Sequence, residues 1–231
     1  MRYQITVNTR IVIMTTCCIT GWFLGQFLAH VLPPKHIIAV VKDIKQVSVI
    51  KPKAVPPPKR QKCNRWSTCP NGEFAFQIMS GGGTKRFPKI CFEDYIILGE
   101  MNAGRGINIA AVNASSGKAI DVATFDMWSG DNSEALVKFI QKIPSSSYVL
   151  MATFDEGSTN LKPQAKKEIE NLGSTLINKI AFRANWIFLG AKGVTIPSEF
   201  KKEKILFANQ KWNKYPGWPS EIQIDGCVGR R

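Results

Sequence analysis

The pattern of apolar and polar positions divides the chain into an apolar leader, a basic polar stretch and a body of short alternating segments. Residues 11–32 form a long apolar run that follows Arg2 and Arg10 and is preceded by no acidic residue. A positively charged start followed by an apolar run is typical of a secretory signal. We therefore expect a signal peptide over residues 1–29, whose cleavage would leave no stable membrane span. An uncleaved anchor is the alternative, because about 20 apolar residues span a bilayer.

The stretch after the leader is basic and contains consecutive prolines. Residues 30–62 contain Pro56-Pro57-Pro58-Lys59-Arg60 near their end and lack enough apolar residues to build a core of their own. Proline cannot propagate a helix, and a segment that builds no core does not fold by itself. We predict a stalk here, followed by a single globular domain over residues 63–231, which is long enough to bury a core.

The body combines short strand patterns with two helical ones. Alternating or continuous apolar runs bounded by turn residues predict strands over 74–79, 88–94, 107–112, 120–125, 147–154, 186–190 and 221–225. Apolar residues at helical spacing after a cap at Asp131 or Ser133 predict one helix. Pro163 and Gly173 bound a second. Strands joined by hairpins and mixed with short helices indicate an α+β fold with antiparallel sheet.

The net charge of +14 is unevenly distributed along the chain. Residues 1–62 carry ten Lys and Arg but one Asp, whereas residues 63–231 carry 21 Lys and Arg with 16 Asp and Glu. The basicity therefore belongs mainly to the leader and stalk. A mildly charged body in an exported chain argues against a nucleic-acid partner.

Four cysteines lie in the body, at Cys63, Cys69, Cys91 and Cys227. In an exported domain this number implies two disulfides, for which three pairings are possible. Their spacing contains no CxxC element, so we predict no metal site.

Both histidines, His30 and His36, precede the body. Ser-His-Asp and Cys-His catalysis are thereby excluded for the domain, as are the commonest zinc sites. Glycoside hydrolysis would need a pair of carboxylates such as Asp126 and Asp155, and nothing in the sequence places them at the required separation. We predict that the protein is not an enzyme and uses no cofactor.

A formal N-glycosylation sequon, Asn113-Ala114-Ser115, lies in an expected hairpin loop. A surface loop of an exported domain is where such a sequon is accessible, so Asn113 is a candidate glycosylation site.

Several strings of the body carry a family resemblance. They are Gly104-Arg105-Gly106-Ile107-Asn108-Ile109-Ala110, Phe125-Asp126-Met127-Trp128-Ser129-Gly130-Asp131, Asp155-Glu156-Gly157-Ser158-Thr159, Phe182-Arg183-Ala184-Asn185-Trp186 and Gly217-Trp218-Pro219. This ordered set resembles the secreted proteins called family with sequence similarity 3. The match extends over essentially the whole body.

The resemblance implies a fold and a disulfide pattern. The fold would be two antiparallel β-sheets lined by short helices around a polar cavity, not a four-helix cytokine. The implied bridges join Cys63 to Cys91 and Cys69 to Cys227. The implied function is that of a secreted cytokine- or hormone-like factor that acts through a cell-surface receptor. The affected processes would be insulin secretion, glucose and lipid metabolism, and apoptosis of islet cells.

A related domain, the stem of a Golgi protein O-mannose N-acetylglucosaminyltransferase, implies a ligand site. There an Asp and an Arg in similar strings hold a sugar, and the matching residues here are Asp155 and Arg183. Planar polar groups beside an aromatic face, here assigned to Trp186, suit a carbohydrate. A lectin-type module that binds glycan is therefore the alternative function. A buried Asp–Arg ion pair that only supports the cavity is the alternative explanation for the two residues.

Overall fold

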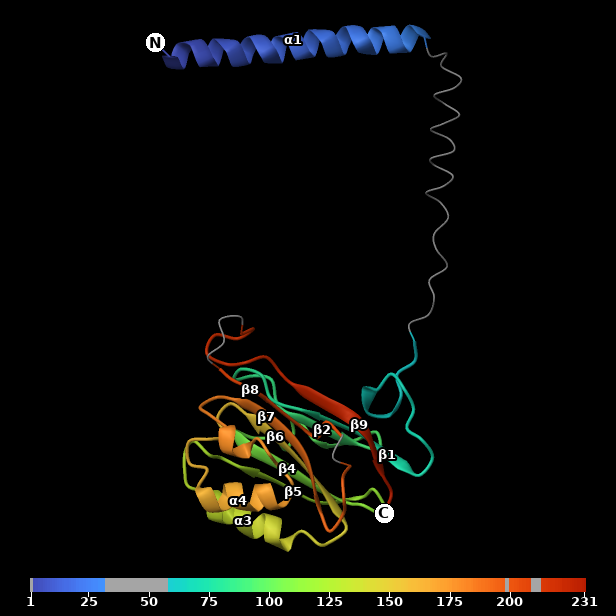
Figure 1. Cartoon of the computed structure of the whole chain (residues 1–231), viewed down its shortest axis with the longest axis vertical. Helices are drawn as coiled ribbons and strands as arrows, with labels where there is room; N and C mark the ends of the chain where they lie inside the picture. The colour runs from blue at the N-terminus through green and yellow to red at the C-terminus, as the bar shows by residue number, and fades with distance from the viewer. Residues whose placement is uncertain (1, 32–57, 198–199, 209–212) are drawn as a thin grey trace. The chain divides into compact units, whose positions relative to one another are not determined.

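The computed structural model describes residues 2–31, 58–197, 200–208 and 213–231 (Figure 1). The chain separates into two compact units, residues 1–57 and 58–231, which we describe individually. Most of the predicted stalk, residues 32–57, lies outside the described residues.

The first unit contains the helix α1 (Arg2–Val31). Its segment Thr9–Val31 is long and apolar enough to cross a membrane, and its side chains are exposed. Apolar side chains on all sides of a helix distinguish it from the one-sided helices of a soluble core. This composition is consistent with a signal peptide near the N-terminus.

The second unit contains two antiparallel sheets, so the α+β prediction is confirmed. A four-stranded sheet has the order β3-β2-β1-β9 and a five-stranded sheet the order β5-β4-β6-β7-β8. The strands are β1 (Glu73–Met79), β2 (Lys89–Phe92), β3 (Tyr95–Leu98), β4 (Gly106–Asn113), β5 (Ala119–Phe125), β6 (Ser147–Phe154), β7 (Asn185–Lys192), β8 (Glu203–Leu206) and β9 (Gln223–Gly229).

The inner strands β4, β6 and β7 are buried on both faces, which explains their nearly continuous apolar sequences. Alternate residues of each strand enter two separate cores. On β7, for example, Trp186 and Phe188 belong to one core while Ile187 and Leu189 belong to the other. The second core is made with residues of β1, β2 and β9, so the two sheets pack face to face over apolar side chains.

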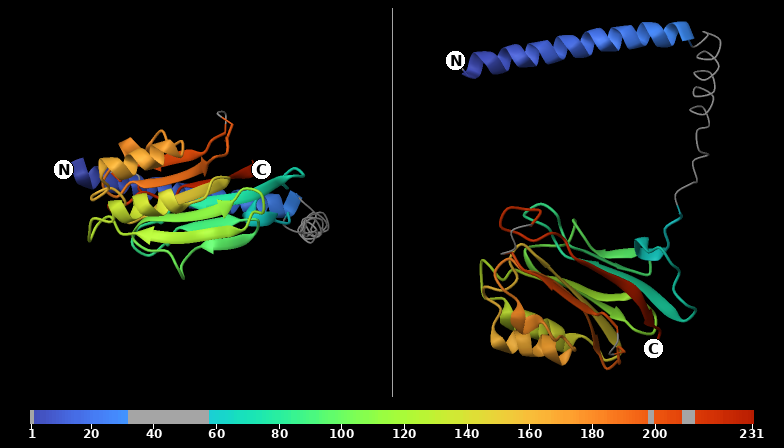
Figure 2. Two further views of the ribbon diagram at one scale, coloured as in Figure 1. Left: turned by 90° about the horizontal axis from the view of Figure 1, so that it is seen from below. Right: turned by 45° about the horizontal axis from the view of Figure 1, so that its top comes forward.

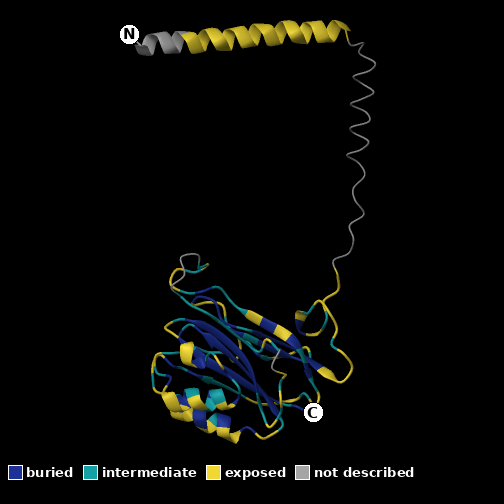
Figure 3. Ribbon diagram, in the orientation of Figure 1, coloured by how far each residue is buried: buried dark blue, intermediate teal, exposed yellow. Residues whose placement is uncertain are grey.

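The helices α3 (Ser133–Lys142) and α4 (Pro163–Asn171) cover the other face of the five-stranded sheet (Figure 2). Their buried residues include Leu136 and Ile140 of α3 and Ala165 and Ile169 of α4. Figure 3 shows the buried central strands and the exposed outer sides of these helices. Two further single turns of 3-10 helix, η1 (Lys62–Asn64) and η2 (Ile177–Lys179), complete the fold.

The turn after β2 and the cap of α3 differ from the sequence-based predictions. The segment predicted as one strand over 88–94 is a hairpin, because Glu93 and Asp94 form its turn with φ angles of 51° and 73°. Two-residue turns with such positive φ values usually contain Asn-Gly. Because Glu-Asp occupies this turn, the sequence does not indicate it. At α3 the N-cap is Asn132, whereas the Ser133 hydroxyl donates to the carbonyl of Asn160.

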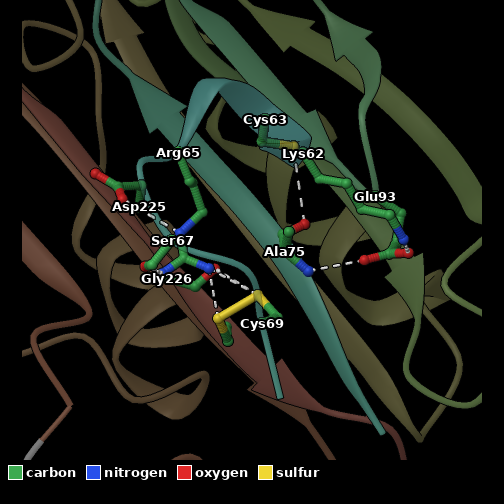
Figure 4. The surroundings of a disulfide bond; sticks show 10 residues. Lys62, Cys63, Arg65, Ser67, Cys69, Ala75, Glu93, Asp225 and Gly226 are labelled. Atoms are coloured by element: carbon green, nitrogen blue, oxygen red, sulfur yellow. Dashed lines mark hydrogen bonds and ion pairs between the residues drawn. A yellow bond between two sulfur atoms is a disulfide. The ribbon is translucent and has the colours of Figure 1, made fainter. Parts of the chain in front are cut away.

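Two disulfides join Cys63 to Cys91 and Cys69 to Cys227, the pairings that the family resemblance implies. The second connects the segment before β1 to β9 across 158 residues. Figure 4 shows Arg65 beside this bridge. Its guanidinium Nη1 lies 2.7 Å from the sulfur of Cys69 and 2.5 Å from that of Cys227, and its Nε lies 3.5 Å from Asp225 Oδ2.

Candidate functional site

Antiparallel pairing brings four loops together at one end of the strands of the five-stranded sheet. Gly106 at the start of β4 lies opposite Phe154 at the end of β6, and Ile107 lies opposite Phe125 at the end of β5. Arg105 directly precedes β4, and Asp126 and Asp155 directly follow β5 and β6, so all three lie at that end of the sheet. Arg183 precedes β7, which is antiparallel to β6, and joins them there. We call these four residues, together with Phe182, Trp128, Glu156 and Trp218, the strand-end cluster.

Asp155 and Arg183 meet at the ring of Trp218 rather than at each other. The Trp218 indole Nε1 donates to Asp155 Oδ1 over 2.8 Å. The Arg183 guanidinium carbon lies 3.8 Å from the Trp218 ring centroid and 4.9 Å from that of Phe182. Among the described residues no carboxylate lies within 4.0 Å of the Arg183 guanidinium nitrogens. The direct Asp155–Arg183 ion pair considered as an alternative is therefore not formed.

Both residues have left-handed backbone conformations, with φ of 58° at Asp155 and 55° at Arg183. Non-glycine residues adopt this region rarely, and surrounding contacts must hold them there. Glu156 supplies such contacts. Its side chain is 2% exposed, and Oε2 accepts from the Arg183 backbone N–H over 2.6 Å.

The other oxygen of Glu156 holds its own loop. Oε1 accepts from the backbone N–H and hydroxyl of Ser158 and from the N–H of Thr159. A buried carboxylate with four charge-assisted hydrogen bonds fixes two loops relative to each other. Sequence reasoning assigned no role to Glu156, although its position beside Asp155 and before two hydroxyl residues is a signal for a loop-closing carboxylate.

A tight turn positions Trp218. Tyr215 and Trp218 pair as an isolated bridge, with the Trp218 N–H donating to the Tyr215 carbonyl over 3.1 Å. Pro216 and Gly217, whose φ is 79°, occupy the two central positions. Proline followed by a left-handed glycine is the signature of a type II turn. The aromatic residues Tyr215 and Trp218 flank the turn, and the Trp218 ring lies against Asp155 and Arg183.

Asp126 belongs to a second polar pair of the cluster. Arg105 donates to both its oxygens, with the shortest contact 2.8 Å from Nη2 to Oδ2. This guanidinium holds the pKa of the Asp126 carboxyl well below its usual range, helped by hydrogen bonds from Ser129 and Trp128. The hydrogen bond to Asp126 also raises the pKa of Arg105, and the charge of Asp155 adds to it. A carboxyl that stays ionised at neutral pH is unsuited to the general-acid step of glycoside hydrolysis.

Exposed aromatic rings border these charges. Trp128 and Phe182 are each 49% exposed, and their ring centroids lie 5.9 Å apart. Planar hydrogen-bonding groups beside open aromatic faces can hold a polar ring-shaped molecule by hydrogen bonds at its edge and contact with its apolar face.

Trp186 does not take part in this arrangement. Its side chain is fully buried, its ring stacks on Phe188, and its Nε1 donates to Glu203 Oε1. The period-two alternation of β7 directs it into the core under the helices. The rings that lie beside Asp155 and Arg183 are those of Trp218 and Phe182, with Trp128 next to Phe182.

The remaining predicted residues lie elsewhere. Asn113 ends β4 and is half-buried, and its Oδ1 accepts from the N–H groups of Ser115 and Ser116. The two disulfides lie in the four-stranded sheet and its flanking segments. Within the described ranges there is no group of three or more His, Cys, Asp or Glu that could hold a metal ion.

Each string that carries the family resemblance contributes to the strand-end cluster. These segments are far apart in the sequence and supply Arg105, Asp126 with Trp128, Asp155 with Glu156, Phe182 with Arg183, and Trp218. Comparison with known proteins agrees. A family profile described as "Interleukin-like EMT inducer" matches residues 105–194, and "Protein FAM3B" of Homo sapiens is 42% identical over 221 residues, 95% of this chain and 94% of that protein. The chain belongs to the FAM3 family.

Other FAM3 relatives match a shorter part of the chain. "Protein FAM3C" of Xenopus laevis is 42% identical over 74% of this chain and 75% of its own length. "Protein FAM3D" of Mus musculus is 41% identical over 79% of this chain and 81% of its own length. The matching profile begins at Arg105 and includes every residue of the strand-end cluster except Trp218. The Tyr215–Trp218 turn therefore lies outside the profile match.

Proposed function

We propose that this FAM3 protein is a secreted, cytokine-like factor. The proposal is supported by family membership, by the description "Interleukin-like EMT inducer" of the matching profile, and by an apolar N-terminal helix in a chain with two disulfides. Cleavage near residue 29 would release the domain, which acts on a cell-surface receptor. The family resemblance gives islet cells as the target and insulin secretion, glucose and lipid metabolism, and islet-cell apoptosis as the affected processes.

Expression of the full chain in mammalian cells tests this proposal. We expect the protein in the medium, with an N-terminus near residue 30 by peptide sequencing. Isolated islets treated with this protein should change glucose-stimulated insulin secretion, and protein that has been reduced and alkylated should not. A protein that stays in the cell membrane, or equal islet responses to native and reduced protein, would contradict it.

A second function, glycan binding by the strand-end cluster, is favoured by one observation. Asp155 and Arg183 each contact Trp218 beside the half-exposed rings of Phe182 and Trp128, without an ion pair between Asp155 and Arg183. Such a set offers hydrogen bonds and apolar faces together, which suits a neutral sugar. The two functions are compatible, because a receptor could be bound at another surface.

A glycan array with the secreted protein tests this second function. Asp155→Asn keeps the shape but removes a charge and an acceptor, so it should weaken glycan binding by about 1–3 kcal/mol. The control is Asp121→Asn, on an exposed position of β5. Receptor-dependent activity in islets should survive both variants. A wild-type protein that binds no glycan, or equal losses in both variants, would argue against the lectin function.

Glycosylation of Asn113 is proposed on the sequon alone. Its Nδ2, to which a glycan would be attached, belongs to a half-buried side chain at the end of β4. Treatment of the secreted protein with a peptide N-glycosidase should increase its mobility on a gel, and Asn113→Gln should abolish that shift. An unchanged mobility would show that the sequon is unoccupied.

A further inference from the structure

A pocket of about 340 Å³ lies beside the strand-end cluster and is formed by two facing turns. Its lining residues are Gly82, Gly83, Thr84, Lys85, Arg86, Tyr215, Pro216 and Trp218. Trp218 is therefore shared between this pocket, which we call the two-turn pocket, and the cluster that contains Asp155 and Arg183.

The first turn follows β1 and is closed by its own backbone. The Gly82 N–H donates to the Arg86 carbonyl and the Arg86 N–H to the Gly82 carbonyl, over 2.8 and 3.1 Å. Gly83 has a φ of 55°, and a Cβ at this position would lie 3.3 Å from the Tyr215 ring. Glycine thus allows the first turn to pack directly against the second.

The charges around the pocket are unbalanced. Lys85 and Arg86 line the pocket, Lys214 precedes the lining residue Tyr215, and Arg86 and Lys214 flank the carboxylate of Glu221. Glu221 lies 3.7 Å from Arg86 Nε and 3.6 Å from Lys214 Nζ, and it accepts from the Tyr215 hydroxyl over 2.6 Å. Burial opposes ionisation of Glu221, but this hydrogen bond and the two cations lower its pKa. It neutralises one of the three positive charges.

Lys85 is the cation with the least compensation. It is exposed, and no carboxylate of the described residues lies within 4.0 Å of its ammonium group. It belongs to the turn that lines the pocket together with Tyr215 and Trp218. Cations that have no protein partner remain able to bind a ligand anion.

We propose that the two-turn pocket binds an anionic sugar of an extracellular glycan, one that carries a sulfate or carboxylate group. Lys85 on the pocket lining binds the anionic group, Lys214 beside Tyr215 adds positive charge next to the pocket, and the Tyr215 and Trp218 rings contact the sugar ring. Because Trp218 also lies against Asp155 and Arg183, adjacent sugars of one glycan chain can occupy the pocket and the cluster together. This inference extends the proposed glycan binding, but it rests on a different pocket and on different charges.

Binding of two oligosaccharides to the protein secreted from cells that express the full chain tests the proposal. One probe is a heparin octasaccharide, which carries sulfates and carboxylates, and the other is a hyaluronan octasaccharide, which carries carboxylates alone. The test variant is Lys85→Gln with Lys214→Gln. The matched control is Lys138→Gln with Lys142→Gln on α3, where one lysine pairs with Glu134 as Lys214 pairs with Glu221.

We expect the test variant to lose about tenfold in affinity for at least one octasaccharide, while the control loses less than about twofold. The probe whose binding is lost identifies the anionic group. Unchanged thermal unfolding of both variants excludes misfolding. Equal losses in test and control variants would show non-specific attraction and overturn the proposal, as would no loss in either. Binding of a sulfotyrosine peptide but of neither octasaccharide would overturn it too.

The proposed neutral-glycan site fails or succeeds separately. Lys85→Gln with Lys214→Gln should leave binding of neutral glycans to the strand-end cluster unchanged. Asp155→Asn should weaken the binding of neutral glycans and leave most of the affinity for the octasaccharides intact. If the protein binds the octasaccharides but no neutral glycan, the proposal for the two-turn pocket stands and the proposal that the strand-end cluster binds glycan fails.

Discussion

Two arginines at different places in the domain contact a planar or polarisable group, yet their surroundings differ. Arg65 lies over the Cys69–Cys227 bridge with a side chain only 12% exposed and Asp225 as its counter-charge. Arg183 lies over Trp218, is half-buried, and has no carboxylate within ion-pair distance among the described residues. A nearly buried cation needs such compensation, whereas an open one keeps its donors for a ligand. The comparison separates a structural end of the domain from the end where we propose binding, and we call these the structural end and the binding end.

The largest expected effect concerns the disulfide end. Removing the bridge with Cys69→Ala and Cys227→Ala should cost about 5 kcal/mol of unfolding free energy, because it closes a loop across 158 residues. Cys63→Ala with Cys91→Ala should cost about 3.5 kcal/mol, because that loop covers 28 residues. Urea unfolding followed by tryptophan fluorescence measures both. If the shorter loop proves as stabilising as the longer, chain entropy is not the source of the difference.

A smaller effect is expected where the binding end is held together. Glu156→Ala should cost about 2–3 kcal/mol, because the partly buried N–H groups of Arg183, Ser158 and Thr159 lose their charged acceptor. It should also abolish glycan binding by releasing the backbone of Arg183. Glu134→Ala on the exposed side of α3 is the control and should change stability by less than about 0.5 kcal/mol. A Glu156→Ala protein with normal stability and binding would show that this carboxylate does not fix the site.

The same contrast explains what the sequence could predict. The inner strands were predictable because burial on both faces requires continuous apolar runs, as in Ser147–Phe154. The edge strand β8 (Glu203–Leu206) was missed, because its four half-buried residues alternate neither in burial nor in polarity. A strand of this kind is defined by its partner β7 and not by its own sequence.

The aromatic partner of the site was harder to predict than its polar residues. Asp155 and Arg183 could be found because they flank predicted strands and match a family string. Trp186 was the nearest aromatic in sequence, but alternation places it on the core side together with Phe188. Trp218 is distant in sequence, and Pro216-Gly217 signals a turn without indicating which loop the ring that follows it would face.

Direct exchange of the two arginines for alanine tests the comparison itself. Arg65→Ala should cost about 1–2 kcal/mol of stability, because Asp225 and the bridge lose a nearly buried charge-assisted partner, and it should leave glycan binding unchanged. Arg183→Ala should cost less than about 1 kcal/mol, because its guanidinium has no ion pair to lose, but it should remove glycan binding. Thermal unfolding and glycan binding are measured on both proteins. If Arg183→Ala were the more destabilising of the two, the assignment of structural and binding ends would be reversed.

The smallest expected effect is the pH dependence contributed by Asp126. Arg105 lowers the folded-state pKa of this carboxyl below the value of about 4 for an unfolded Asp. The ion pair therefore stabilises the domain fully above about pH 4, and its contribution is lost as the pH falls from there through the lower folded-state pKa. Because the two side chains are 36% and 30% exposed, solvent screening limits the contribution to under about 1 kcal/mol.

The Asp126→Asn protein should be less stable than the wild type at pH 7, and its stability should approach that of the wild type towards pH 2 in chemical unfolding experiments. An Asp121→Asn control should show no such convergence, and a stability difference for Asp126→Asn that is constant from pH 7 to pH 2 would mean that the carboxylate acts through packing alone.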